Sequence, residues 1–186
     1  MVALKIIRKD EKCEELAQSE IRVLRNLLEH ERKDVDSNII HMKDNFVFRD
    51  HLCITFELMS INLYELMKAN SFKGLSLNHI RKIAVEMLKA MRLLKRLKII
   101  HCDFKPENIC LKYPNRPAIK LIDFGSACYE NEKLYTYVQS RYYRAPEIIF
   151  GIPYGSQSDL WAFGCILAEL WLGKPLFPGE NELECV

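Results

Sequence analysis

The sequence predicts an α+β protein in which a small sheet with one helix precedes a larger, mainly helical part. Up to residue 59, short stretches rich in β-branched and aromatic residues flank a single helical pattern. After residue 60, two long helical patterns alternate with loops that contain most of the prolines. The 186 residues are enough to bury a core, and a hydrophobic content of 49% excludes a disordered chain.

The first part, residues 1–59, begins with a β-branched strand pattern from Val2 to Ile7. From Glu14 to Leu28, apolar residues recur every three or four positions, which predicts a helix with one buried face. Alternating stretches then predict three short strands, separated by Asn45 and by Arg49-Asp50. These strands are Ile39 to Asp44, Phe46 to Phe48 and Leu52 to Phe56.

The second part, residues 60–186, follows a brief linker over residues 57–60. Asn62 is a typical helix cap, and it predicts a short helix that runs through Lys68. Ser76 precedes a longer helical pattern that ends before Ile99. This second helix has a continuous apolar face, so we expect it to be central and buried.

The rest of the second part is rich in loops, where binding and catalytic residues are common. A strand is expected from Ile119 to Ile122. We expect a final helix that is capped by Ser156 or Ser158, runs through Leu170 and ends at Gly173, with Pro175 beyond it.

Composition and charge exclude several classes of protein. Lys and Arg number 27 against 25 Asp and Glu, and the two signs are interleaved, so we expect neither a nucleic-acid partner nor a membrane surface. No apolar run is long enough to span a membrane. Seven cysteines form no C-x-x-C pair and follow no secretory signal, which favours reduced thiols in an intracellular compartment, the cytoplasm or the nucleus.

The densest group of chemically active residues is His101-Cys102-Asp103-Phe104-Lys105-Pro106-Glu107-Asn108, and Asp123-Phe124-Gly125 follows it. Phosphoryl transfer needs a carboxylate that orients the attacking hydroxyl and accepts its proton. It also needs an ammonium that offsets charge on the transferred group, and oxygen ligands that hold Mg²⁺. Asp103 fits the first role, Lys105 the second, and Asn108 with Asp123 the third.

These motifs resemble the signature set of the eukaryotic protein kinases. By this resemblance, Lys5 of Val2-Ala3-Leu4-Lys5 contacts the nucleotide phosphates, and Glu20 pairs with it. Ala145-Pro146-Glu147 matches the end of the activation segment, and the stretch from Asp159 to Gly164 matches the helix that anchors the catalytic loop. The resemblance implies ATP and Mg²⁺ as cofactors and protein substrates as partners; the oligomeric state stays open.

Within the kinases, the chain resembles the dual-specificity tyrosine-phosphorylation-regulated kinases (the DYRK family), in particular their class II branch. Three features carry the resemblance: Cys102 in place of the usual arginine, Asn62-Leu63-Tyr64-Glu65-Leu66, and the stretch Tyr135-Thr136-Tyr137-Val138-Gln139-Ser140-Arg141-Tyr142-Tyr143-Arg144. The family autophosphorylates the second tyrosine of the Tyr-x-Tyr pair, which is Tyr137 in this chain. Arg141 and Arg144 would receive its phosphate. Phe56 would be the gatekeeper, and Glu57 to Met59 would present backbone groups to adenine.

The implied fold is a partial, kinase-like two-lobe α+β fold, with residues 1–59 in the first lobe and 60–186 in the second. The sequence before Lys5 leaves no room for the two strands and the glycine-rich loop that cover ATP phosphates, and the last helices of the second lobe are also absent. The implied activity is transfer of the γ-phosphoryl group to serine or threonine of proteins, with autophosphorylation of Tyr137. The alternative is a truncated, catalytically impaired kinase-like module that binds or competes for partners.

Taken one at a time, the same residues have simpler interpretations. His101 is expected to be a stacked or hydrogen-bonded core residue rather than a catalytic one. The other simple interpretations are a solvent-exposed strand lysine for Lys5, an exposed helix charge for Glu20, turn carboxylates for Asp103 and Asp123, loop aromatics for Tyr135 and Tyr137, and solvent-facing or substrate-binding side chains for Arg141 and Arg144.

Overall fold

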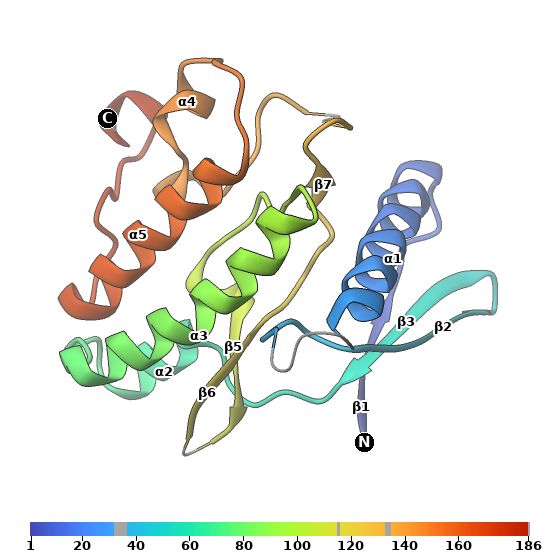
Figure 1. The fold of residues 1–186 in the computed structure, drawn as a ribbon, viewed down its shortest axis with the longest axis horizontal. Coiled ribbons are helices and arrows are strands. Elements are labelled where there is room, and N and C mark those ends of the chain that lie inside the picture. Colours follow the sequence, from blue (N-terminus) through green and yellow to red (C-terminus); the bar gives the residue numbers. More distant parts are fainter. Residues whose placement is uncertain (32–36, 115, 133–134, 186) are drawn as a thin grey trace.

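A computed structural model describes residues 1–31, 37–114, 116–132 and 135–185. Figure 1 shows two groups of elements, the first with three strands and one long helix and the second dominated by two long helices. This arrangement confirms the α+β class and its order along the chain.

The first group is an antiparallel sheet with strand order β1-β3-β2. Its strands are β1 (Val2–Ile6), β2 (Met42–Phe48) and β3 (His51–Glu57), and helix α1 (Glu11–Glu31) packs on it. Ala17 and Ile21 of α1 are buried against Leu52 and Ile54 of β3, as the helical periodicity predicts. The side chain of Asp10 accepts the Cys13 N–H at 3.0 Å, so the helix begins earlier than its apolar pattern indicates.

The prediction of separate strands on either side of Asn45 was wrong. Asn45 lies inside β2 and pairs with Ile54, while the irregularity in the register falls between Met42 and Asp44. The strand passes through Asn45 because its backbone bonds with β3 compensate for a weak intrinsic preference. The turn at Arg49-Asp50 is confirmed, and both residues adopt positive φ angles of 48° and 62°.

The second group begins with α2 (Leu63–Ala69) and α3 (Leu77–Arg96). Asn62 caps α2 as predicted, since its Oδ1 accepts the Glu65 N–H at 2.8 Å. Ser76 precedes α3, but its hydroxyl contacts His79 Nδ1 at 2.8 Å instead of capping the helix.

Helix α5 (Ser156–Leu172) has Gly155 as its N-cap, so the prediction that Ser156 or Ser158 caps it was wrong. The Ser158 hydroxyl donates to the Gly155 carbonyl at 2.6 Å, and this bond within the first turn takes the side chain away from the capping position. Gly173 ends the helix with a φ of 76°, as predicted.

Short elements connect the long helices. They include two pairs of strands, of which the pair β4–β7 had no signal in the sequence because each strand has only two residues. Strand β6 begins at Arg116, before the predicted Ile119, and pairs with β5. The elements are β4 (Ile99–Ile100), η1 (Pro106–Asn108), β5 (Ile109–Tyr113), β6 (Arg116–Leu121), β7 (Cys128–Tyr129), η2 (Arg141–Tyr143), α4 (Pro146–Ile149) and η3 (Glu182–Cys185).

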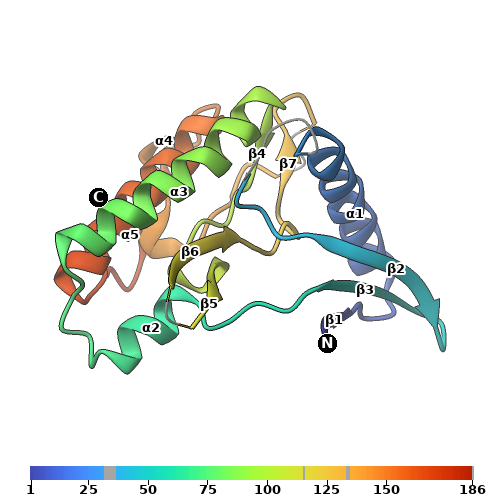
Figure 2. The same cartoon turned by 60° about the horizontal axis from the view of Figure 1, so that its bottom comes forward.

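The main core lies where α3 packs against α5 and β6, and Figure 2 shows these two helices side by side above the β5–β6 hairpin. Met87 of α3 and Phe163 of α5 are among its fully buried side chains. The segment before β2 joins this core, because Ile39 bridges to Leu121 and the Ile40 N–H donates to the Leu121 carbonyl at 2.9 Å. The first sheet is therefore attached at the end of β6, next to Asp123.

Candidate active site

The loop after β4 is held in place by a buried carboxylate on α5. Asp159 accepts the backbone N–H of His101 at 2.7 Å and that of Cys102 at 3.1 Å. These bonds hold Cys102 at a positive φ of 63°, which turns the chain sharply before Asp103. Burial raises the pKa of Asp159 to about 7, although both N–H bonds act to lower it. The structure thus brings Asp159 to the loop, as the resemblance implied.

His101 is a structural residue at the base of this loop. It is fully buried, and the rings of Phe104 and Phe124 pack edge-on against it at centroid distances of 5.1 and 4.9 Å. Burial lowers the pKa of His101, which keeps the ring neutral. Its Nδ1 accepts the Asp103 N–H, so its Nε2 carries the proton that is donated to the Ile122 carbonyl at 3.0 Å.

Asp103 is the centre of a group of polar side chains. Lys105 Nζ lies 2.8 Å from Asp103 Oδ2, and Asn108 Nδ2 donates to the same oxygen at 3.0 Å. Its other oxygen, Oδ1, accepts the hydroxyl of Ser140 at 2.8 Å. Ser140 was not predicted to belong to the site, because 37 positions separate it from Asp103 and no local pattern links them.

The second group forms around Lys5. Its ammonium lies 2.8 Å from Glu20 Oε2 and 3.0 Å from Asp123 Oδ1, so β1, α1 and the end of β6 meet at one charge. Burial by itself lowers the pKa of Lys5, but the two carboxylates outweigh it and the pKa is raised. Burial likewise acts to raise the pKa of Asp123, and Lys5 overcomes this and lowers it. The Lys5 ammonium and the Asp123 carboxylate are therefore held in their charged forms.

The polar side chains around Asp103 and those around Lys5 are connected through the backbone. The Ile122 N–H donates to the Asn108 carbonyl at 2.9 Å, and the next residue, Asp123, has a positive φ of 59°. Because Asn108 Nδ2 is used by Asp103, the amide Oδ1 is the atom that Asn108 can offer a cation. Carboxylate and amide oxygens suit Mg²⁺, which takes only a few protein ligands beside phosphate oxygens and water. In the described ranges, no group of three or more His, Cys, Asp or Glu side chains could hold a metal on its own.

A cleft of about 390 Å³ lies beside Lys5 and Asp123. It is lined by Phe56, Glu57, Leu58 and Met59 at the end of β3 and by Ile40 and Ile122 behind them. The Glu57 carboxylate accepts the His41 N–H at 2.8 Å and the ammonium of Lys120. Lys120 was not predicted; the one available signal is a lysine between the apolar residues Ile119 and Leu121 of a buried strand.

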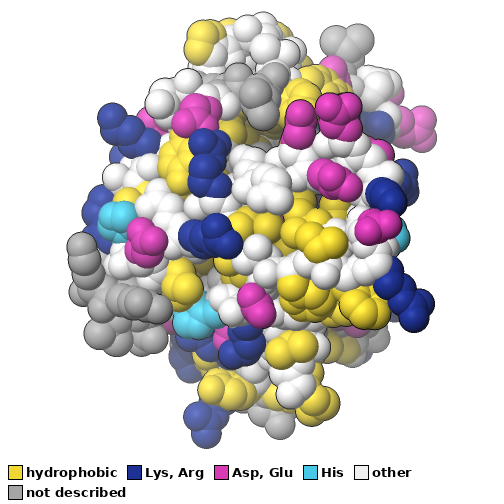
Figure 3. Space-filling model, turned by 90° about the vertical axis from the view of Figure 1, so that its right-hand side faces the viewer, with side chains coloured by type: hydrophobic (Ala, Val, Ile, Leu, Met, Phe, Trp, Pro, Cys, Tyr) yellow, Lys and Arg dark blue, Asp and Glu magenta, His cyan; other side chains and the backbone are white. Residues whose placement is uncertain are grey.

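Arg144 lies against Tyr137, one of the predicted pairs. The structure does not bring Arg141 to the same tyrosine: its Nη1 donates to the Glu180 carbonyl instead, at 2.5 Å. Arg144 Nη1 also donates to Glu182 Oε1 at 2.7 Å, a partner that sequence reasoning missed because 38 positions separate the two residues. A wide hollow of about 880 Å³ lies between α1 and this segment, and Figure 3 shows acidic and basic side chains interspersed over the face nearest α1.

Two comparisons of the sequence with known proteins give consistent results. The protein kinase domain family matches residues 1–186. The chain is 54% identical over 184 residues to dual specificity tyrosine-phosphorylation-regulated kinase 4 of Homo sapiens. The matched residues make up 99% of this chain and 35% of that protein. The chain is also 54% identical over 181 residues to dual specificity tyrosine-phosphorylation-regulated kinase 3 of Rattus norvegicus, covering 97% of this chain and 31% of that protein.

A third relative, dual specificity tyrosine-phosphorylation-regulated kinase mbk-2 of Caenorhabditis elegans, is 55% identical over 183 residues, which are 97% of this chain and 22% of that protein. The chain therefore spans about a third or less of the length of these relatives. No helix in the described part of the chain has the length and apolar character needed to cross a lipid bilayer.

Proposed function

Because the chain belongs to the protein kinase family, we propose that its cleft binds ATP with Mg²⁺ and that the protein transfers the γ-phosphoryl group to serine or threonine of protein substrates. The observation that carries this proposal is Lys5, whose ammonium contacts Glu20 at 2.8 Å and Asp123 at 3.0 Å. This triad joins three elements beside a cleft, and it leaves a cation and a carboxylate facing the position that nucleotide phosphates would take. The 54–55% identity to the DYRK relatives supports the same activity.

Adenine would bind at the end of β3. Met59 lies beyond the last sheet pair of β3, and no other backbone group in the described ranges accepts its N–H. The Glu57 side chain is engaged by His41 and Lys120, and its backbone N–H donates to the His41 carbonyl at 3.1 Å. The Glu57 carbonyl is therefore the group that it would present to a ligand. Phe56 closes the inner end of the cleft.

Asp103 would act as the base that orients the attacking hydroxyl. Its Oδ1 already accepts a hydrogen bond from the Ser140 hydroxyl at 2.8 Å, so this oxygen can accept from an alcohol. Lys105, 2.8 Å from Asp103 Oδ2, would offset charge on the transferred phosphoryl group. Asn108 and Asp123 would hold Mg²⁺, which when bound neutralises phosphate charge.

Autophosphorylation of Tyr137 is the second part of the proposal. Tyr137 is 60% exposed, so a phosphoryl donor can reach it, and its hydroxyl lies 2.6 Å from Arg144 Nη1. A phosphate on this oxygen would gain charge-assisted hydrogen bonds from Arg144. Arg141 would need to leave the Glu180 carbonyl to contribute as well.

We further propose that the protein works in a reducing compartment, the cytoplasm or the nucleus. None of the seven cysteines forms a disulfide, which is typical of proteins in a reducing compartment. No observation on the described residues favours the alternative of a non-catalytic binding module, since each expected catalytic side chain has a partner suited to its role.

Two variants separate binding from chemistry. The wild-type chain should show a higher melting temperature with Mg²⁺ and ATP, because a ligand of the native state raises the unfolding midpoint. Asp123→Asn should lose this rise, whereas Asp103→Asn should keep it and lose transfer of labelled phosphate to casein and to Tyr137. Transfer that survives Asp103→Asn, or a melting temperature that ignores nucleotide in the wild type, would contradict the proposal.

A further inference from the structure

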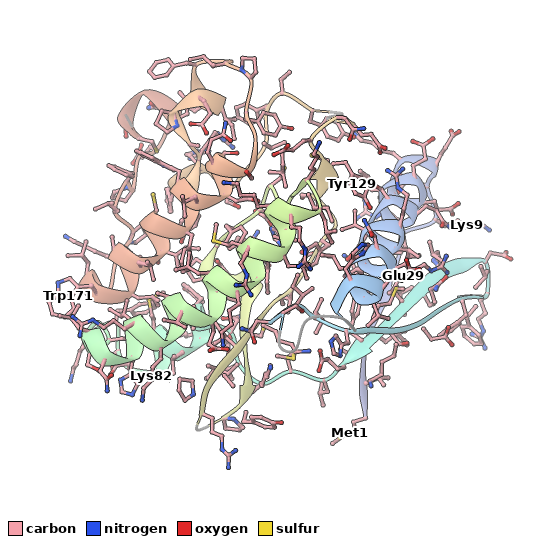
Figure 4. All side chains as sticks on the ribbon, viewed as in Figure 1. Met1, Lys9, Glu29, Lys82, Tyr129 and Trp171 are labelled. Atoms are coloured by element: carbon pink, nitrogen blue, oxygen red, sulfur yellow. The ribbon has the colours of Figure 1, made fainter. Side chains whose placement is uncertain are left out.

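A groove of about 520 Å³ lies between the first half of α3 and the start of β6, and it shares no lining residue with the catalytic cleft. Arg81, Lys82, Val85 and Glu86 line it from α3, spaced so that they occupy one side of the helix. Arg116, Pro117 and Ala118 of β6 line the other wall. Figure 4 places Lys82 on the outer side of α3, close to its first turns.

The rim of the groove carries positive charge that no carboxylate among the described residues neutralises. Within the described ranges, no carboxylate lies within ion-pair distance of Arg81, Lys82 or Arg116. Arg116 Cζ lies 5.9 Å from the centroid of the Tyr113 ring. This contact positions the guanidinium but does not neutralise its positive charge. The whole of α3 has six basic residues and one acidic residue, although the chain as a whole carries a net charge of only +2.

The single acidic residue of the groove is already compensated. Glu86 accepts hydrogen bonds from Lys89 Nζ and from Asn38 Nδ2, both at 2.8 Å. These bonds, that of Lys89 first, lower the pKa of Glu86 and keep it ionised beside a cation. The net field in the groove therefore comes from the three unpaired cations, and it favours a negatively charged partner.

The floor of the groove is apolar. Val85 is 55% exposed, although it lies on a helix whose other face supplies the core, and Pro117 and Ala118 extend the apolar surface across to β6. A groove with an apolar floor and a cationic rim matches a peptide in which apolar side chains alternate with carboxylates. Single-stranded nucleic acid fits less well, because the lining offers no aromatic ring on which bases could stack.

We propose that this groove, which is separate from the catalytic cleft, is a docking site for a peptide segment of a partner protein. In this segment, acidic residues alternate with leucine or similar apolar residues. Carboxylates of the segment would pair with Arg81, Lys82 and Arg116. Its apolar side chains would cover Val85, Pro117 and Ala118. Such a surface would recruit a partner whether or not the cleft is occupied.

Fluorescence anisotropy of this chain with a labelled peptide of alternating glutamate and leucine tests the proposal. We expect saturable binding that weakens as salt is added. Replacing glutamate by glutamine, or leucine by serine, should weaken binding of the peptide, because each change removes one of the two complementary features. No saturable binding of the Glu/Leu peptide would overturn the proposal.

Matched variants locate the site. Arg81→Glu with Lys82→Glu and Arg116→Glu should weaken binding by about tenfold or more. Lys43→Glu with Arg49→Glu and Lys73→Glu makes the same change in net charge at exposed positions outside the groove, and it should have little effect. An equal loss in both triple variants would mean non-specific attraction and would overturn the site.

The apolar floor has its own control. Val85→Gln should weaken binding, whereas Leu88→Gln, which alters a residue that is 48% exposed on the same helix but outside the groove, should not. Circular dichroism melts of each variant separate lost binding from lost folding. Tighter binding of a twelve-residue oligouridylate than of the peptide, with the same dependence on Arg81 and Lys82, would reject the peptide and identify a nucleic-acid site.

Discussion

The guanidinium of Arg144 lies over the ring of Tyr137, with its Cζ 3.9 Å from the ring centroid and its Nη1 2.6 Å from the phenolic oxygen. The same nitrogen donates to Glu182 Oε1 at 2.7 Å. A phosphate on Tyr137 would therefore compete with a carboxylate for one donor. If Tyr137 is phosphorylated as proposed, Glu182 would oppose the contact between the phosphate and Arg144.

Glu182→Gln should make phosphorylation of Tyr137 more stabilising. Removing the carboxylate relieves repulsion of the phosphate, worth about 1 kcal/mol for a partly exposed pair. The measurement is the difference in melting temperature between phosphorylated and unphosphorylated chain. Glu180→Gln is the control, since only the backbone carbonyl of Glu180 contacts an arginine. An identical difference in wild type and Glu182→Gln would refute the competition.

Lys5→Met should destabilise the fold as well as remove nucleotide binding. It leaves Glu20, whose side chain is 2% exposed, without its cation and next to Asp123. The expected loss is about 2 kcal/mol of unfolding free energy in urea titrations, below the range for fully buried pairs because Lys5 is 36% exposed. Lys5→Met combined with Glu20→Met should be more stable than Lys5→Met alone. Simple addition of the two losses would show that the residues do not interact.

Asp159 should make the stability depend on pH. Burial raises its pKa from 3.8 to about 7, so between these values the folded state binds a proton more readily than the unfolded chain. Its contribution to the free energy of unfolding is therefore largest below pH 4 and falls as the pH rises to 7, by about 4 kcal/mol in total.

The comparison with Asp159→Asn isolates this effect. The lowered pKa of His101 has the opposite sign, with stability lost as the pH falls below 6.5, but His101 is present in both proteins. Urea titrations from pH 4 to 8 should show the advantage of the wild type over Asp159→Asn shrinking as the pH rises. A constant difference across this range would mean that Asp159 does not titrate there.

Gly173→Ala should be among the most damaging small substitutions. A Cβ at this position, where φ is 76°, would lie 1.8 Å from the carbonyl oxygen of Phe72. Gly151→Ala is a matched control, because its φ is 67° but no atom lies within 4 Å of the added Cβ. We expect Gly151→Ala to cost about 1 kcal/mol of backbone strain and Gly173→Ala clearly more. Thermal melts of the two variants check this, and equal melting temperatures would contradict the clash.

Much of this protein can be predicted from patterns within a few residues of each other. The apolar periodicity of α1 and α3, the Asn62 cap and the Gly173 end depend on local geometry, and all are confirmed. The site residues Asp103, Lys105 and Asn108 are also close in sequence, so their motif indicates their chemistry directly.

Local patterns failed where two nearly equal choices compete. Gly155 rather than Ser156 or Ser158 caps α5, because the Ser158 hydroxyl bonds to the Gly155 carbonyl within the first turn. Strand β2 continues through Asn45, because its hydrogen bonds with β3 outweigh a small intrinsic preference. The two-residue strands β4 and β7 exist only as each other's partner, so neither has a signal of its own.

The sequence by itself determined the α+β class, the long helices and the candidate residues for phosphoryl transfer. Only the tertiary structure decided which charges meet: Lys5 with Asp123 across 118 positions, Lys120 with Glu57 across 63, and Arg144 with Glu182 across 38. The reason is that helix and turn preferences act over a few residues, whereas ion pairs and the basic groove of α3 and β6 depend on how distant segments pack in space.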